Sequence, residues 1–357
     1  MKKYNGTELL RELCEINGPS GFEYKVAEFI KAQTEGLCEY IPDRTGNLIC
    51  LVRGGREGYD AQSPKKIMIS AHMDEVGFII KRIGDDGYVH FILDGGIDAK
   101  VLSARSVTLF NEENTIKGVI ASKPIHALSP EERKEAIGAD KLFIDVGADS
   151  ADEVKQYVSV GDFGTFDSDF VTFGENGRMI KGKAIDDRLG CAVMIEAMRE
   201  LAEKKDKLSA DIYFAFTTRE ELGNSGAQTV ANMIEPDYSI VLETTAIADI
   251  AGVPENSRVS EVGKGGTISL MDRSTIYGRE IVDFALDLAK REGIPAQVKK
   301  YVSGGNDAGH IHKSGKGVKT LAISAPTRYL HSACCVASLD DYDSIKALVL
   351  AIVRNLK

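Results

Sequence analysis

The sequence predicts an α/β fold in which a mixed sheet flanked by helices is interrupted by a small, barrel-like β insert. Helix-like and strand-like segments alternate at both ends of the chain, as in sheets that are covered by helices on both faces. Between about residues 76 and 177, short runs rich in Val, Ile, Phe and Thr are cut by Gly and Asp, and helical periodicity is scarce. A chain of 357 residues also exceeds the usual size of one hydrophobic core.

The part before the insert predicts two helices followed by two strands. Apolar residues in 9–16 follow helical spacing, and the Asn-Gly-Pro-Ser-Gly run at 17–21 ends this helix. A second amphipathic stretch covers residues 22–30. Residues 48–52 and 67–71 are short apolar runs bounded by turn residues, which is typical of buried strands.

The insert itself predicts mainly strands. Apolar runs of strand length lie at residues 77–80, 88–92, 107–110 and 117–120. Residues 129–133 are an exception, because Ser129 can cap a helix whose first turn holds a proline and acidic residues.

Alternation resumes after about residue 179. We expect helices over 189–204, 225–234, 279–291 and 342–356, and strands over 211–217, 238–242 and 321–324. Residues 1–75 and 178–357 are therefore predicted to form one discontinuous domain, and residues 76–177 the inserted one.

Composition and missing motifs exclude several classes of function. The formal net charge is −10, with 44 basic and 54 acidic residues, which argues against a nucleic-acid partner. No run approaches the ~18 apolar residues of a membrane span, and the sequence shows no secretory signal, no CxxC pair and no disulfide-like spacing of cysteines, so we expect a cytoplasmic protein. A near-match to the P-loop at 177–183 is followed by Ala184, which lacks the required hydroxyl. GxSxG and HExxH motifs are absent, which removes two other hydrolase classes.

Histidine and acidic residues gather where predicted strands end. In open α/β sheets, ligands bind beyond the carboxyl ends of the strands. Two imidazoles and several carboxylates are the ligand set of a paired divalent-metal centre with a spare carboxylate for proton transfer. This pattern predicts a metal-dependent hydrolase. The residues concerned are His72, Asp74, Asp186, Glu220, Glu221, Glu243 and His331.

Several of these residues suit particular roles. Asp74, two positions along an extended segment from His72, can face the same way and fix the tautomer of the imidazole. Asp186 is a short, rigid candidate for the carboxylate that bridges two metals. The neighbouring side chains of Glu220 and Glu221 diverge, so that one can bind metal while the other takes the proton of an attacking water and passes it to a leaving amine.

Structural alternatives remain open at this point. Glu220 with its neighbour is typical of a solvated helix start, and Asp186 can cap the helix that follows it. His310 and His312 form a weaker metal motif in a Gly-rich loop. The same loop predicts a pocket wall in which backbone donors or Asp307 meet substrate.

Four strings carry a resemblance to a known family. They are Ala-His-Met-Asp-Glu-Val-Gly at 71–77, Lys-Pro-Ile-His-Ala-Leu-Ser-Pro-Glu-Glu-Arg at 123–133, Gly-Lys-Ala-Ile-Asp-Asp-Arg-Leu-Gly-Cys at 182–191 and Arg-Tyr-Leu-His-Ser at 328–332. With these strings, nearly the whole chain resembles the tetrahedral aminopeptidases. These are co-catalytic metallopeptidases of the metallo-exopeptidase fold that include glutamyl aminopeptidases and proteins once labelled cellulase M.

The resemblance implies an aminopeptidase that acts on short peptides with two divalent ions per subunit, zinc or cobalt, with manganese as an alternative. It implies Glu220 as the general base and Asp74 as the residue that orients His72. It also implies that the insert drives assembly into a hollow, tetrahedral homododecamer, or dimers of the chain, and controls access. The implied metal ligands are His72, Asp186 and Glu243 for one ion, and Asp186, Glu221 and His331 for the other.

The chain departs from the family pattern at three places. Relatives often have Asp at the position of Glu243 and Gln at that of Arg219, and Ala333-Cys334-Cys335 replaces a Pro-containing continuation. Three other functions remain as alternatives. One is a related metal-dependent amidohydrolase that acts on acylated amino acids, and another is a non-enzymatic assembly protein. The third is a glycosidase, which needs two carboxyls facing each other about 5–9.5 Å apart, whereas adjacent glutamates cannot flank one bond.

Overall fold

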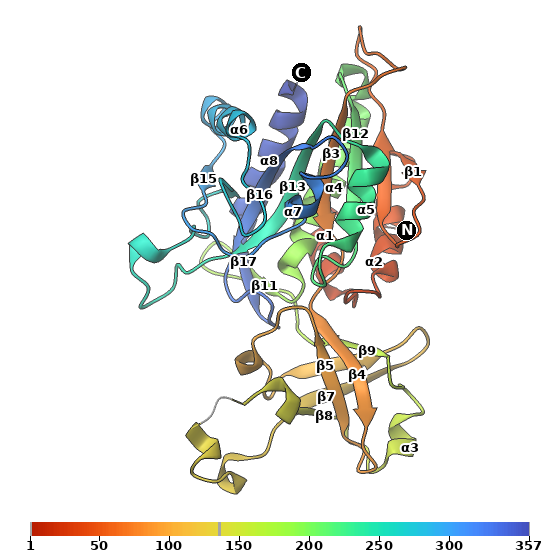
Figure 1. Ribbon diagram of the computed structural model, residues 1–357, viewed down its shortest axis with the longest axis vertical. Coiled ribbons are helices and arrows are strands. Elements are labelled where there is room, and N and C mark those ends of the chain that lie inside the picture. Colours follow the sequence, from red (N-terminus) through yellow and green to blue (C-terminus); the bar gives the residue numbers. More distant parts are fainter. Residues whose placement is uncertain (1, 135–136, 357) are drawn as a thin grey trace.

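The computed structural model describes residues 2–134 and 137–356 and has two lobes (Figure 1). Within these residues, the larger lobe is an eight-stranded sheet with helices on both faces, and the smaller is a closed six-stranded barrel. The predicted α/β fold with a barrel-like insert is therefore confirmed. The helices are α1 (Gly6–Glu15), α2 (Tyr24–Thr34), α3 (Ala151–Val154), α4 (Ile185–Glu203), α5 (Ser225–Ile234), α6 (Arg279–Glu292), α7 (Ala308–Ile311) and α8 (Leu339–Asn355).

The large sheet is mixed, and its central strands are parallel. β12, β3, β13 and β16 run in one direction, so their carboxyl ends meet at one edge, where the chain passes from β3 into the barrel. β2 is antiparallel to β12, and β14 is antiparallel to β16. In spatial order the strands are β1 (Glu39–Ile41), β2 (Leu48–Val52), β12 (Asp211–Thr217), β3 (Lys66–His72), β13 (Tyr238–Ala246), β16 (Lys319–Thr327), β14 (Gly266–Ile268) and β15 (Ala296–Val298).

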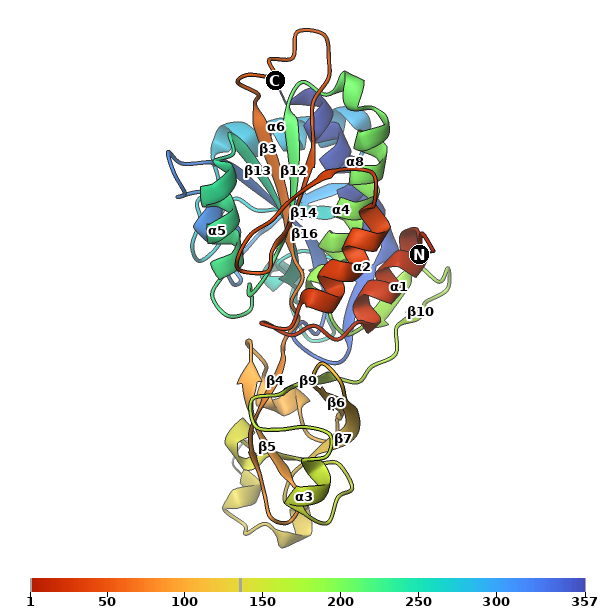
Figure 2. The same cartoon turned by 90° about the vertical axis from the view of Figure 1, so that its right-hand side faces the viewer.

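Helices cover the two faces of this sheet unequally. α4 packs on β3 and β13 and also contacts α1, α2 and α8, while α5 lies on the opposite face with α7 (Figure 2). Residues 185–195 of α4 are all buried, because this part of the helix has the sheet on one side and other helices on the other. After the charged residues of its first turn, the helix is apolar on all sides over residues 189–195, as expected in such a position.

The barrel has a hydrophobic core of its own. At its centre, the ring of Phe78 meets those of Phe91 and Phe166 edge to face, with centroids 5.1 and 5.2 Å apart. Aromatic pairs prefer this geometry, and closure of the barrel leaves no strand edge unpaired. Around the barrel the strands are β4 (Gly77–Ile83), β5 (Val89–Asp94), β8 (Phe143–Asp145), β7 (Thr115–Ala121), β6 (Ser106–Phe110) and β9 (Phe163–Phe166).

A third, small sheet joins the returning chain to the large lobe. It consists of β10 (Val171–Phe173), β11 (Met179–Gly182) and β17 (Cys335–Ser338). The last barrel strand thus ends at Phe166, and β10 pairs outside the barrel. The predicted limits of the insert, residues 76 and 177, stay a prediction.

A buried ion pair lies where the chain crosses between the lobes. Glu75 precedes the first barrel strand and Lys183 follows β11; their side chains are 2% and 5% exposed. Lys183 Nζ lies 2.8 and 3.0 Å from the two carboxylate oxygens of Glu75 and donates to Asn17 Oδ1 at 2.9 Å. Thr165 in β9 donates to the same Asn17 oxygen at 3.0 Å. Buried charges persist when they are paired and hydrogen-bonded, and here the partners come from both lobes.

Most predicted elements are present, and several differ in extent or type; α4 begins at Ile185 and β16 runs from Lys319 to Thr327, for example. β13 continues to Ala246, so Glu243 lies within the strand, because the pairing with β16 persists beyond the apolar run. α8 begins at Leu339, where Ser338 caps it by accepting from Asp340 N–H. The helix predicted at 129–133 is a single 3₁₀ turn at Glu132–Lys134, although Ser129 and Glu132 form the reciprocal hydrogen bonds of a capping box.

Candidate metal centre and active site

The seven site residues predicted from the sequence lie together at the carboxyl edge of the central strands, facing the barrel. They come from five separate segments, which only the sheet brings together. His72 ends β3, Asp74 follows it, Asp186 lies in the first turn of α4, Glu220 and Glu221 follow β12, Glu243 lies in β13, and His331 lies in the loop after β16.

Asp186 lies between the two histidines. Its Oδ1 is 3.3 Å from His72 Nε2, and its Oδ2 is 3.3 Å from His331 Nε2. Glu243 Oε1 is 3.5 Å from the same His72 nitrogen, and Glu221 Oε2 is 3.5 Å from that of His331. We call His72, Asp186 and Glu243 the first donor set, and Asp186, Glu221 and His331 the second donor set.

These separations fit metal ligation better than direct hydrogen bonding. Strong hydrogen bonds between such groups have lengths of about 2.7–2.9 Å. A tetrahedral ion with bonds of about 2.0–2.1 Å holds its ligand atoms about 3.3–3.4 Å apart. The contacts of 3.3–3.5 Å within each donor set match this second value. The residues therefore fit two ions that share the carboxylate of Asp186.

Both imidazoles are oriented by main-chain carbonyls. His72 Nδ1 is 3.1 Å from the carbonyl oxygen of Asp74, and His331 Nδ1 is 2.8 Å from that of Gly96. A carbonyl only accepts hydrogen bonds, so Nδ1 carries the hydrogen and the Nε2 lone pair faces the donor set. The carboxylate of Asp74 is farther from His72 Nδ1, at 3.5 Å, and its predicted role in orienting His72 stays a prediction.

The carboxylate of Asp74 also holds the turn that carries both glutamates. It is fully buried and accepts from the backbone N–H groups of Glu220 and Glu221, each at 3.1 Å, and from Ser20 Oγ at 2.7 Å. Burial opposes its ionisation, but the contacts with His72 and these donors outweigh burial and lower the pKa of Asp74. Asp74 thus fixes the backbone from which the two glutamates diverge.

Glu220 and Glu221 face different partners. The side chain of Glu221, 4% exposed, points to His331. Glu220 lies close to His72 and Glu243, but one of its oxygens accepts from Asn224 Nδ2 at 2.7 Å. Among the described residues, no ion pair joins Glu220 to either histidine, although ligand atoms of Glu220, His72 and Glu243 all lie within 4.8 Å of one another; its role as a base beside the first donor set, and not as a ligand within it, stays a prediction.

Without cations, the buried carboxylates hold protons. Burial and the charge of Asp186 raise the pKa of Glu221 to about 8 and that of Glu243 to about 7. Burial lowers the pKa of His331, but its contact with Asp186 and the charge of Glu221 outweigh burial and raise it to about 10. Protons thus partly balance a negative charge that divalent cations are suited to neutralise.

Three supporting contacts escaped prediction because nothing in the local sequence marks them. These are the Ser20 hydroxyl on Asp74, the Asn224 amide on Glu220, and the Gly96 carbonyl on His331. The two oxygens of Asp307 accept from Asn224 and from Thr217 Oγ1, and the expectation that this residue meets substrate stays a prediction.

The weaker metal motif of His310 and His312 does not join the site. His312 Nδ1 bonds the carbonyl of Ala308 at 2.7 Å. Within the described residues, neither His310 nor His312 belongs to a group of donors close enough to hold an ion.

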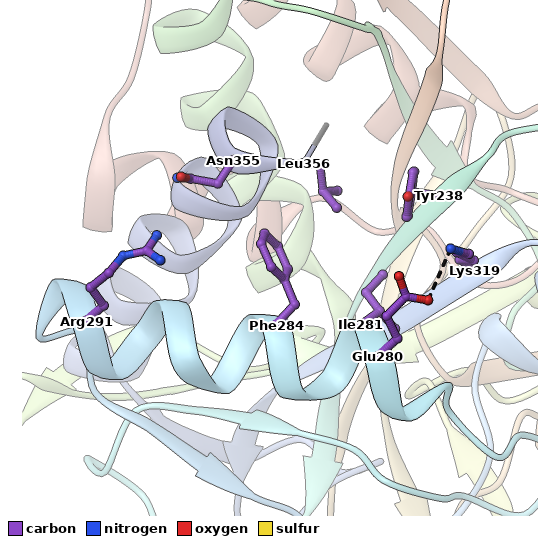
Figure 3. A pocket seen from close by; sticks show the side chains of 8 residues that line it. All are labelled: Tyr238, Glu280, Ile281, Phe284, Arg291, Lys319, Asn355 and Leu356. Atoms are coloured by element: carbon purple, nitrogen blue, oxygen red, sulfur yellow. Dashed lines mark hydrogen bonds and ion pairs between the residues drawn. The ribbon is translucent and has the colours of Figure 1, made fainter.

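A separate pocket of about 450 Å³ lies away from this edge (Figure 3). Tyr238 and Lys319, at the amino ends of β13 and β16, line it together with Phe284 of α6. An ion pair of 3.2 Å between Lys319 and Glu280 closes one side. The pocket thus lies at the opposite ends of the strands from the donor sets.

Comparison with known proteins decides the family. A family model described as M42 glutamyl aminopeptidase matches residues 46–348, a span that includes all seven site residues. The chain belongs to the M42 glutamyl aminopeptidase family. This M42 chain is therefore an aminopeptidase, a hydrolase of peptide bonds, and the resemblance described above is confirmed.

Relatives of this M42 aminopeptidase cover almost its entire length. The lysyl aminopeptidase of Pyrococcus furiosus is 31% identical over 362 residues, with 98% of this chain and 97% of that protein covered. A TET aminopeptidase from a marine sediment thaumarchaeote has a structure that matches with a TM-score of 0.93 and 36% identity, over 98% of this chain and 96% of the other. The Pyrococcus horikoshii TET1 peptidase, which can assemble into a tetrahedron or a large octahedral shell, matches with a TM-score of 0.85 and 33% identity, over 98% and 99% of the two chains.

Within residues 2–134 and 137–356, no helix is both long and apolar enough to cross a bilayer.

Proposed function

We propose that this chain removes amino-terminal residues from short peptides with two divalent ions and Glu220 as the general base. One observation carries the proposal: the two oxygens of Asp186 each lie 3.3 Å from the Nε2 atom of a different histidine. A carboxylate in that position is suited to bridge two ions, and Glu243 and Glu221 complete a set around each histidine.

The first donor set would hold one ion and the second donor set the other. Bound there, divalent ions act as Lewis acids that polarise the carbonyl of the peptide bond and lower the pKa of the attacking water. Imidazole and carboxylate ligands suit zinc and cobalt, with manganese as the alternative.

Glu220 would move the proton. In the metal-free protein, burial and the charge of Glu243 raise its pKa well above the usual value, which supports this role because the ionised carboxylate then has a high affinity for a proton. Asn224 fixes one of its oxygens, which leaves the other to accept the proton of the attacking water. The same oxygen then donates that proton to the amine that leaves when the peptide bond breaks, so Glu220 ends in its starting state.

The roles of the insert and of assembly are part of this proposal. We expect residues 76–177 to drive association into a tetrahedral homododecamer, or dimers of the chain, and to limit access to short peptides. The similarity to the assembling P. horikoshii peptidase supports this, as do exposed apolar side chains on the barrel lobe such as Ile125 and Val160, 71% and 63% exposed. The six free cysteines suit a reducing, cytoplasmic setting.

The matched variants Glu220→Gln and Glu221→Gln test the assignment. Glu220→Gln should bind two ions per chain but lose most of its turnover, by about 10²–10⁴-fold, because the base is gone. Glu221→Gln should instead weaken metal binding. Metal content by mass spectrometry and turnover of aminoacyl nitroanilides measure the two effects separately. Near wild-type turnover of Glu220→Gln contradicts the general-base role.

The same turnover assay distinguishes the proposed aminopeptidase from the rival deacylase of acylated amino acids. An aminopeptidase requires the free amine of its substrate, whereas a deacylase requires the acyl group. Turnover of N-acetylated amino acids in preference to free peptides, at equal metal loading, contradicts the proposal.

A further inference from the structure

We propose that the inserted barrel contributes directly to the metal centre. The Gly95-Gly96 turn after β5 positions Glu221 and His331, and thereby sets the affinity for the ion of the second donor set but not for the other ion. This inference rests on the proposed two-metal function. It assigns the insert a role in the chemistry of each subunit that is separate from assembly.

His331 is held by this turn directly. Its Nδ1 bonds the carbonyl oxygen of Gly96 at 2.8 Å, across 235 positions of sequence, while its Nε2 faces Asp186 and Glu221. The direction of the ring therefore depends on where the barrel places Gly96. A metal-binding histidine whose second nitrogen loses its partner commonly loses 10–100-fold in metal affinity.

Glu221 lies close to the neighbouring glycine. A Cβ atom on Gly95 would lie 3.3 Å from both Cβ and Oε2 of Glu221, and 2.7 Å from Cγ1 of Val76. Gly95 also has a φ of +89°, which side-chain-bearing residues rarely adopt. Glycine at this position has no Cβ to collide with Glu221 and adopts the positive φ without strain, so the turn can lie close against the carboxylate of Glu221.

The barrel core anchors both sides of this contact. Ile97, directly after the turn, is 7% exposed and belongs to the hydrophobic core of the barrel. Ala333, two positions after His331, is 5% exposed and packs in the same core, and Cys334 packs against it. The turn and the loop that carries His331 are therefore fixed to one packed body.

The first donor set has no such connection. His72 and Glu243 are residues of strands in the large sheet, and His72 Nδ1 bonds the carbonyl of Asp74. Among the described residues, no hydrogen bond or ion pair joins His72 or Glu243 to the insert. A disturbance of the barrel turn should therefore weaken one ion and spare the other.

Three variants of the full-length chain test this selectivity. Gly96→Val pushes on the imidazole, because even a Cβ there would lie 3.4 Å from His331 Nδ1. Gly95→Ala pushes first on Val76 and then on Glu221. Gly161→Ala is the matched control, since Gly161 also lies in the insert with a φ of +94° but has open space where its Cβ would be. Zinc is titrated into each apo protein against a chromogenic chelator, and anomalous diffraction from zinc-soaked crystals locates each ion.

We expect Gly96→Val and Gly95→Ala to weaken the ion of the second donor set by about 10–100-fold, with the other ion within about threefold of wild type. Gly161→Ala should bind both ions as the wild type does, even if it unfolds at a lower temperature. Equal weakening of both ions, no weakening, or the same loss in Gly161→Ala overturns the inference. If either glycine variant does not fold, Gly96→Ala is tested in its place. We expect it to weaken the ion of the second donor set by a smaller factor and to spare the other ion. A wild-type chain that binds fewer than two ions contradicts the proposed function itself.

Discussion

Replacing Asp74 with asparagine tests how the centre is held in place, because it changes the chemistry of one buried group and keeps its shape. The carboxylate accepts from two backbone N–H groups, those of Glu220 and Glu221, through different oxygens. An amide has only one oxygen. In either orientation of the introduced amide, its NH₂ group would face a backbone donor, and one of the two bonds would be lost.

The magnitude follows from those contacts. A hydrogen bond to a charged group contributes about 1.5–3 kcal/mol. At about 1.4 kcal/mol for each tenfold change, displacement of Glu221 should weaken the ion of the second donor set by about 10–150-fold. Turnover should fall further, because Glu220 moves with the same turn. The first ion should change by less than about threefold, since His72 keeps its shorter bond to the backbone carbonyl of residue 74.

Two measurements check this expectation. Zinc affinities come from competition with a chromogenic chelator, and kcat and KM come from aminoacyl nitroanilides at saturating metal. Ser20→Ala is the control, because it removes one donor to Asp74 and leaves both backbone bonds intact; we expect it to stay within a few-fold of wild type. If Asp74→Asn weakens the first ion and spares the second, the carboxylate acts mainly on His72 and our reasoning is refuted.

Two further predictions concern the ligands themselves. Glu243→Asp draws the carboxylate back by about one methylene, while β13 stays fixed by its ladder to β16. The ion of the first donor set should therefore bind at least about tenfold more weakly. The exposed Glu280→Asp is the control, and tighter binding of this ion in Glu243→Asp contradicts the geometry. Metal affinity should also rise with pH. In the metal-free protein the pKa values of His331 and Glu221 are raised to about 10 and about 8, so binding below these values must displace protons, and the apparent Kd should fall by about tenfold or more per pH unit between pH 6 and 8. Zinc competition at pH 6, 7 and 8 measures this slope, and a flat profile excludes proton displacement.

The sequence was informative where residue type and local pattern determine the outcome. Apolar runs at 67–71 and 211–217 predict buried strands, and those strands exist. Polar residues at their ends predict a site, because parallel strands bring their carboxyl ends together. The pattern failed for β13, where polar side chains face the site while the backbone pairing continues to Ala246.

What the sequence could not show is which distant atoms hold the ligands. The bond between His331 and Gly96 spans 235 positions, and no local motif marks it. The hydroxyl of Ser20 reaches Asp74 across 54 positions, and Lys183 joins Glu75 across 108. The first of these contacts depends on how the barrel packs against the large lobe, and the other two on how distant segments of the large lobe come together.

The two main-chain carbonyls that hold His72 and His331 have a consequence for how this site varies over evolution. Every amino acid supplies the same carbonyl oxygen, so a substitution at position 74 or 96 cannot delete either bond by removing a functional group. A substitution here reaches the imidazoles through the shape of the chain: by bending the backbone, as at Gly95, or by crowding the His331 ring, as a side chain at position 96 would. Exchange of the side chain at either position thus leaves the hydrogen-bond acceptor of each imidazole in place, and with it the histidine tautomer.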